Sequence, residues 1–243
     1  TDQTSPAQDT PDWTQVRRRC SGLPEPSPGS GIWQHQGMIL EPIPTVSFTR
    51  MSEGTADDYR LLAEQEAIDL ALFPDRVLGW LRSMDEPTGY QVTRFEHSLQ
   101  AATRALRAGE DEEMIVCALL HDVGDVLAPA NHSEVAAAML RPYVSDRSYW
   151  IIKHHGVFQE VYYAHHYGRD PNGRDRYRDH PWFQAAADFC ADYDQVSFDP
   201  DYDTEPVVVF EPMVRRVLST ARSHVIDEVH VGQVIQGAGP RDA

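Results

Sequence analysis

Apolar residues recur three or four positions apart over most of the chain from Thr55 onward, and this spacing predicts amphipathic helices. The periodic segments are separated by Gly, Pro or Asn residues, which commonly end helices. We find no strand-rich block and no internal repeat. The pattern therefore predicts an all-α fold. Its expected helices span residues 55–72, 74–81, 93–108, 111–127, 131–140, 146–166, 181–196 and 211–230.

The first 50 residues follow a different pattern. Residues 1 to about 30 are rich in Pro, Ser, Gly, Asp and Gln, and such a segment buries too little apolar surface to offset the entropy cost of ordering it. Between Gly31 and Arg50, apolar residues are broken by Pro42 and Pro44, which is typical of an extended arm. We expect residues 1–50 to be a flexible tail and extended arm, 51–230 a single helical domain, and 231–243 a C-terminal tail.

Length and charge narrow the class of protein. A chain of 243 residues with 41% hydrophobic content is long enough for one well-buried core. Because 38 acidic residues face 21 basic ones, for a formal net charge of −17, we expect no nucleic-acid or anionic membrane partner. No apolar run approaches the ~18 residues of a membrane span, and the three cysteines lack CxxC spacing. These features indicate a cytoplasmic protein, and they leave its oligomeric state unknown.

An adjacent His-Asp pair carries the first chemical signal. His121 and Asp122 follow the apolar run Met114–Leu120, so an imidazole and a carboxylate come at the end of a buried segment. A buried carboxylate without a partner is costly. A divalent cation would satisfy both groups, because neutral imidazole and carboxylate are good metal ligands. Alternatively, Asp122 caps the following turn and His121 is satisfied within the core.

Further candidate ligands lie on neighbouring predicted helices, and this repetition favours metal binding over isolated core histidines. Adjacent residues on a helix point about 100° apart, so only one residue of the pair 154 and 155 is expected to face a common site. The candidates are His97, His132, His154, His155, Asp192 and Asp194.

The order of these residues, with an upstream His, a His-Asp pair, further histidines and a late Asp, resembles the HD-domain superfamily over roughly residues 85–200. The resemblance implies that residues 51–230 form a single HD-domain helical bundle with catalytic function. It implies that Asp122 bridges two metal ions and that His121 binds the first. Tyr193-Asp194 is closer to the family's closing ligand than Asp192, and His155 is favoured over His154. The implied metal ligands are His97, His121, Asp122, His132, His155 and Asp194.

Two segments resemble the mixed-valent di-iron oxygenases of this superfamily, which include myo-inositol oxygenase and the phosphonate-cleaving oxygenases. Residues 91–102, where Gln100 follows His97 by three positions, resemble the first-ligand helix, and residues 121–128 resemble the matching stretch of the inositol enzyme. The resemblance implies that the enzyme holds an Fe(II)/Fe(III) pair and uses O2. It also implies a small polar substrate that is hydroxylated, with an amine-bearing compound and a phosphonate as the two options. Manganese, cobalt or nickel would fit the same ligands.

The superfamily also contains phosphohydrolases, so the alternative is a metal-dependent phosphohydrolase acting on a nucleotide or small phosphate ester. There Asp122 would orient a metal-bound hydroxide and Glu96 could assist proton transfer. Such enzymes generally benefit from Lys or Arg near the substrate, and the site region holds few. A third alternative is a degenerate HD domain that binds a metal or ligand for regulation.

Two positions depart from the oxygenase pattern. Where the phosphonate oxygenases carry a Tyr and a Glu before the first ligand, this chain has Pro87 and Tyr90. Tyr90 either replaces the Glu as a removable iron ligand or is an ordinary packed tyrosine. Asp125 stands where the inositol enzyme has a Lys. Its carboxylate either binds an ammonium group of the substrate by Coulomb attraction or caps the next turn.

Four further side chains are candidates for catalysis or substrate binding. Gln100 and Gln159 each lie about one turn from a predicted ligand. Each amide either reaches the substrate or a ligand, or caps a neighbouring helix. Tyr163 and His165 belong to an aromatic stretch before the Arg-containing loop 168–179. That loop is either a lid over the substrate or a solvated surface segment.

Overall fold

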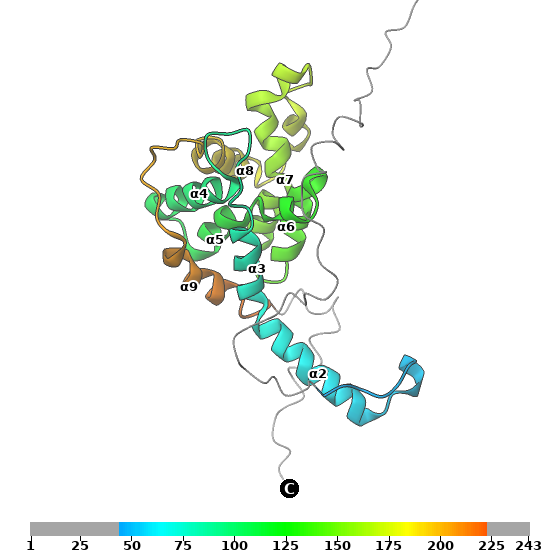
Figure 1. Ribbon diagram of the computed structural model, residues 1–243. Coiled ribbons are helices and arrows are strands. Elements are labelled where there is room, and N and C mark those ends of the chain that lie inside the picture. Colours follow the sequence, from blue (N-terminus) through cyan, green and yellow to red (C-terminus); the bar gives the residue numbers. More distant parts are fainter. Residues whose placement is uncertain (1–43, 223–243) are drawn as a thin grey trace, which may run out of the picture. The chain divides into compact units, whose positions relative to one another are not determined.

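The computed structural model describes residues 44–222, and every regular element within this range is helical, which confirms the all-α prediction. Residues 1–43 of the tail and arm expected at 1–50 lie outside the described residues, as do the C-terminal tail expected at 231–243 and the final part of the helix expected at 211–230. All elements belong to the compact unit that begins at Val46 (Figure 1). The α-helices are α2 (Ala56–Ala71), α3 (Phe73–Arg82), α4 (Arg94–Ala108), α5 (Glu112–Leu120), α6 (His132–Leu140), α7 (Asp146–Tyr163), α8 (Phe183–Phe189) and α9 (Val207–Val217).

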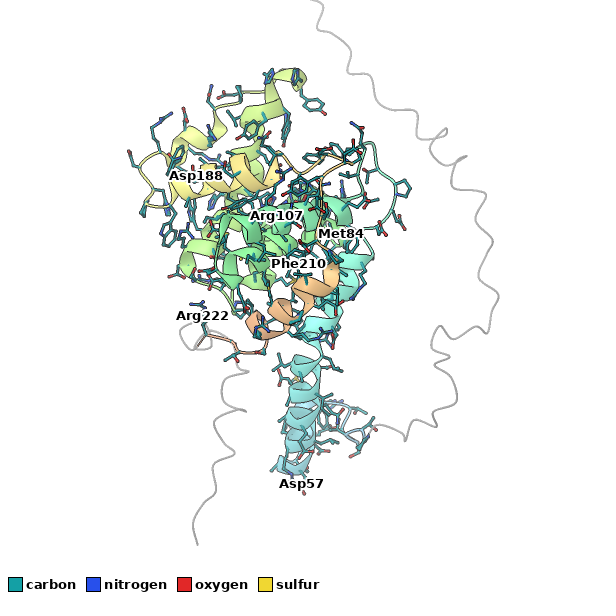
Figure 2. All side chains as sticks on the ribbon, turned by 90° about the vertical axis from the view of Figure 1, so that its left-hand side faces the viewer. Asp57, Met84, Arg107, Asp188, Phe210 and Arg222 are labelled. Carbon is teal, nitrogen blue, oxygen red and sulfur yellow. The ribbon has the colours of Figure 1, made fainter. Side chains whose placement is uncertain are left out.

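Helix α5 is the centre of the core, because its seven residues from Met114 to Leu120 are all buried. A helix that is apolar on every side must be covered on every side, and α5 packs against α4, α7 and α9 (Figure 1). Phe210 of α9, labelled in Figure 2, is fully buried in the same core. The neighbouring helix α4 has sharp ends. A capping box of Thr93 and Glu96 begins it, and Gly109 in the left-handed conformation, at φ 80°, ends it.

The chain between these long helices adopts short 3₁₀ and π segments that place functional side chains. They are the 3₁₀ helices η1 (Met51–Glu53), η2 (Val123–Val126), η3 (Pro129–Asn131), η4 (Ala164–Tyr167) and η5 (Gly173–Tyr177), and the π-helix η6 (Cys190–Asp194).

Three of the predicted helices are therefore longer than the helices in the structure. The helix expected at 111–127 ends at Leu120, and η2 follows after the His-Asp pair. The helix expected at 146–166 ends at Tyr163, and the one at 181–196 divides into α8 and η6. Apolar spacing continues through each break, because the short segments also turn apolar side chains towards the core. The helix expected at 211–230 begins earlier, at Val207, after the N-cap Pro206.

Gly124 is the point of closest approach between η2 and α6. A Cβ atom at this position would lie 2.2 Å from the backbone oxygen of His132 and 2.9 Å from its backbone carbon. Real side chains do not tolerate such contacts with backbone, so η2 can pack against the start of α6 only with glycine here.

We expect Gly124→Ala to lower the free energy of unfolding by about 1–3 kcal/mol, the usual cost of overpacking. Urea denaturation measures this change. Gly79→Ala is the matched control, because a Cβ at Gly79 in α3 meets nothing within 4 Å. The control should gain up to about 0.5–1 kcal/mol. Equal unfolding midpoints for the two variants would contradict the prediction.

Candidate metal centre

The six predicted ligands come from five elements that converge in the core. His97 lies on α4, His121 and Asp122 follow the end of α5, His132 begins α6, His155 lies on α7, and Asp194 ends η6. His97, His121, His155 and Asp194 are buried.

The first group of ligand atoms comprises His97 Nε2, His121 Nε2, Asp122 Oδ2 and Asp194 Oδ1. The two imidazole nitrogens are 3.1 Å apart. Asp194 Oδ1 lies 3.4 Å from His97 Nε2 and 3.6 Å from His121 Nε2, and Asp122 Oδ2 lies 3.6 Å and 3.5 Å from the same two atoms. Four potential ligand atoms thus face one small volume.

The second group comprises His132 Nε2, His155 Nε2 and Asp122 Oδ1. The two nitrogens are 3.3 Å apart, and Asp122 Oδ1 lies 3.3 Å from His132 Nε2 and 3.2 Å from His155 Nε2. The two oxygens of Asp122 therefore face different groups of histidines. The groups are contiguous, because His121, Asp122 and His155 also offer ligand atoms within 4.8 Å of one another.

Backbone carbonyls orient three of the four histidines. Nδ1 of His97 lies 2.9 Å from the oxygen of Ser197, Nδ1 of His121 lies 2.8 Å from that of Ala118, and Nδ1 of His155 lies 2.7 Å from that of Ile152. A carbonyl accepts a hydrogen bond, so each Nδ1 carries the proton and each Nε2 presents a lone pair to the centre.

Facing lone pairs and carboxylates need positive charge between them. Asp194 Oδ1 is buried and has no hydrogen-bond partner within the part of the chain that the structure describes, which is costly for an ionised carboxylate unless a cation satisfies it. The residues present therefore fit a metal ion at each of the two groups.

The pKa shifts of His121 and Asp122 also indicate that this centre favours a positive charge. Burial opposes protonation of His121, but the carboxylates of Asp122 and Asp194 outweigh it and raise the pKa of this imidazole to about 9. Burial likewise opposes ionisation of Asp122, yet the nearby histidines hold the pKa of its carboxyl well below the usual range. The centre thus favours a positive charge, and metal binding would compete with a proton.

The π-helix η6 and the side chain of Gln159 together fix the position of the Asp194 carboxylate. In η6 the backbone N–H of Gln195 bonds the oxygen of Cys190, five residues earlier, and π turns of this kind occur often at functional sites. The amide of Gln159, on α7, donates a hydrogen bond to Asp194 Oδ2. That bond occupies one carboxylate oxygen and leaves Oδ1 for the first group.

A cavity of about 210 Å³ opens beside both groups. Asp122, which belongs to both groups, forms part of its wall together with His97 and His132. Among the described residues, Arg94 is the one Lys or Arg side chain in this wall. The lining residues are Tyr90, Val92, Thr93, Arg94, His97, Asp122, Asp125, Pro129, His132, Gln159, Tyr163 and Phe198.

Of the residues predicted to act on substrate, four line this cavity: Tyr90, Asp125, Gln159 and Tyr163. Tyr90 is 61% exposed and packs on Phe198, with ring centroids 4.8 Å apart. Phe198 in turn stacks on His97 at 4.4 Å, so an aromatic ring covers the first ligand.

Three other predicted residues lie elsewhere. Gln100 is buried, and its amide donates to the oxygen of Asp199 at 2.7 Å and accepts from the nitrogen of Asp199 at 3.3 Å, so it holds the segment after η6. His165 is exposed in η4 beside His166. The carboxylate of Glu96 is engaged in the α4 capping box.

The structure also separates the competing candidates. His154 Nδ1 bonds the backbone oxygen of Trp150 at 2.8 Å and its ring stacks on that of Trp150, while His155 faces Asp122. Asp194 faces His97 and His121, whereas Asp192 belongs to neither group of ligand atoms. Sequence reasoning missed Arg94 and Phe198. Arg94 could have been found, since it precedes His97 by one turn on the same helix face.

The comparisons with known proteins agree with this geometry. The HD domain family model matches residues 94–181, a range that includes five of the six predicted ligands. A [1-hydroxy-2-(trimethylamino)ethyl]phosphonate dioxygenase (glycine-betaine-forming) from Leisingera caerulea is 54% identical over 43 residues, which cover 18% of this chain and 22% of that protein. The chain thus aligns with about a fifth of this relative's length. Among residues 44–222, no helix is long and apolar enough to cross a membrane.

Proposed function

We propose that the protein is a di-iron oxygenase that uses O2 to cleave a small hydroxylated phosphonate. The match of the HD domain family model to residues 94–181 supports a metal-dependent enzyme. The observation that carries the proposal is Asp122, whose two oxygens face two separate groups of histidines. A pair of irons in the Fe(II)/Fe(III) state, when bound, would supply the activation of O2. His97, His121, Asp122 and Asp194 would hold one ion, and His132, His155 and Asp122 the other.

The cavity supports a small substrate with two differently charged ends. A volume of about 210 Å³ admits only a small molecule. Arg94 offers a cation to a phosphonate, and the rings of Tyr90, Tyr163 and Phe198 are of the kind that attract a quaternary ammonium group. The relative from Leisingera caerulea is named for a phosphonate that carries both a hydroxyl and a trimethylamino group.

The proposed reaction balances without an external reductant. A 1-hydroxyphosphonate and one O2 give a carboxylate and phosphate: the C–P bond breaks, and both oxygen atoms of O2 enter the products. The residues of the chain would bind and orient the substrate in this reaction. Arg94 would hold the phosphonate, and the side chain of Gln159, fixed by its bond to Asp194, would contact the substrate from the cavity wall.

One observation favours the phosphohydrolase as a second candidate. The small number of Lys and Arg residues near the predicted site argues against a phosphohydrolase in the sequence, but Arg94 lines the cavity. A guanidinium beside two metal sites would also suit a phosphate ester. Glu96, engaged in its helix cap, is not placed to assist proton transfer there.

The deciding experiment combines metal content with the oxygen requirement. Protein from iron-supplemented medium should contain two irons per chain and give a coupled mixed-valent signal in low-temperature electron paramagnetic resonance after partial reduction. With a trimethylammonium-bearing 1-hydroxyphosphonate, it should consume one O2 per phosphate released. Phosphate release from nucleotides without O2, by protein that carries manganese, cobalt or nickel and gives no coupled signal, would establish the hydrolase instead.

A further inference from the structure

Asp125 lies between a cation and a predicted metal ligand. Its Oδ2 is 2.9 Å from Arg94 Nη1, and its Oδ1 is 3.4 Å from His132 Nδ1. The side chain of Asp125 is only 9% exposed. Within η2, its backbone nitrogen donates a hydrogen bond to the oxygen of Asp122 at 2.9 Å, which fixes the spacing between the two carboxylates.

His132 differs from the other three histidines in its backbone partner. They have carbonyl oxygens 2.7–2.9 Å from Nδ1, whereas His132 Nδ1 is 3.5 Å from the oxygen of Pro129. A separation of 3.5 Å is at best a weak hydrogen bond. The side chain of His132 is also the most exposed of the four, at 26%. Asp125 Oδ1, at 3.4 Å, is a second oxygen that faces His132 Nδ1, and a charged carboxylate attracts an N–H group more strongly than a neutral carbonyl does.

We propose that Asp125, held in place by Arg94, is a positioning residue that orients His132 for the second metal ion. A carboxylate that accepts from the outer N–H of a ligating histidine fixes the tautomer and raises the basicity of the ring. This inference rests on the two-metal site of the proposed function. It replaces the expectation that Asp125 attracts a substrate ammonium group.

Arg94 explains how a second carboxylate is tolerated beside Asp122. The guanidinium nitrogen Nη1 of Arg94 lies 2.9 Å from Asp125 Oδ2, so a positive charge is directly beside this carboxylate. The guanidinium therefore stabilises the ionised form that can accept from His132. Because Asp125 already has these two partners, an ammonium group would have to compete with Arg94 for it.

The test is a titration of metal-free protein with Mn²⁺, in which electron paramagnetic resonance of the free ion gives the number of sites and their affinities. Wild-type protein should bind two ions. Asp125→Asn should weaken the second ion about 10–100-fold, as is usual for outer partners of ligating histidines, with the first unchanged. Arg94→Gln should shift the second affinity in the same direction. Arg107→Gln is the control, since Arg107 (Figure 2) pairs with Asp203 and Glu205 and does not line the cavity.

Circular dichroism checks that each variant is folded. If Asp125→Asn does not fold, Arg94→Gln provides an independent test. Choline binding, measured by calorimetry, should be the same in wild type and Asp125→Asn. Unchanged affinity for the second Mn²⁺ in both variants would overturn the inference, as would a loss of choline binding with both metal affinities intact. A wild-type protein that binds fewer than two ions would overturn the proposed function itself.

Discussion

Asp122→Ala is expected to remove both metal ions and to abolish activity. Among residues 44–222, Asp122 is the one residue whose carboxylate reaches both groups, with Oδ1 3.2 Å from His155 Nε2 and Oδ2 3.5 Å from His121 Nε2. Without it, each ion would lose an anionic ligand and the two sites would no longer be linked. Inductively coupled plasma mass spectrometry of protein purified from iron-supplemented medium should fall from about two irons per chain to a small fraction of one.

Asp203→Ala is the control for this change, because the side chain of Asp203 is 94% exposed and its partner Arg107 lies outside the cavity. The control should retain both irons and full activity. If Asp122→Ala also retained two irons and turned over substrate at the wild-type rate, the six-residue assignment would have to be abandoned.

Asp194→Asn is expected to weaken the first metal ion by at least about 100-fold, since even outer partners of ligands contribute 10–100-fold. The substitution preserves shape but removes the charge of a fully buried carboxylate, whose Oδ1 accepts no hydrogen bond from any residue between 44 and 222. The second group contains no atom of Asp194, so its ion should remain bound. The Mn²⁺ titration that distinguishes two affinities measures this selectivity.

Asp192→Asn serves as the matched control, as the change is chemically identical and two residues away, at a position outside both groups. It should bind two ions with wild-type affinities. The reverse result, in which Asp192→Asn loses an ion and Asp194→Asn retains both, would show that the late ligand had been assigned to the wrong residue.

The two predictions rest on residues that could be found in the sequence. A carboxylate and an imidazole after a run of seven apolar residues, Met114 to Leu120, conflict with simple burial unless a partner is present. The helices themselves follow from apolar spacing, because a helix buries one face and side chains three or four residues apart share it. The spacing of apolar residues does not show where α5, α7 and α8 end, because apolar residues continue through those breaks.

Contacts across the fold determined the roles of the surrounding residues. Gln100 and Gln159 look equivalent in the sequence, each about one turn from a ligand. The fold brings Asp199 to the first and Asp194 to the second, so one amide holds a backbone segment and the other a candidate ligand. Asp125 and Arg94 are 31 positions apart, and only the tertiary fold brings them together as an ion pair.

The sequence by itself determined the helical class and the order of the ligand residues along the chain, because both depend on local periodicity and on residue type. Tertiary structure alone decided that His155 rather than His154 faces Asp122, and that Asp125 faces His132 and Arg94. The physical reason is that a side chain's partner is set by helix rotation, by breaks such as η2 and η6, and by close approaches such as Gly124 to His132. These are properties of packing between segments distant in the chain, and no local pattern records them.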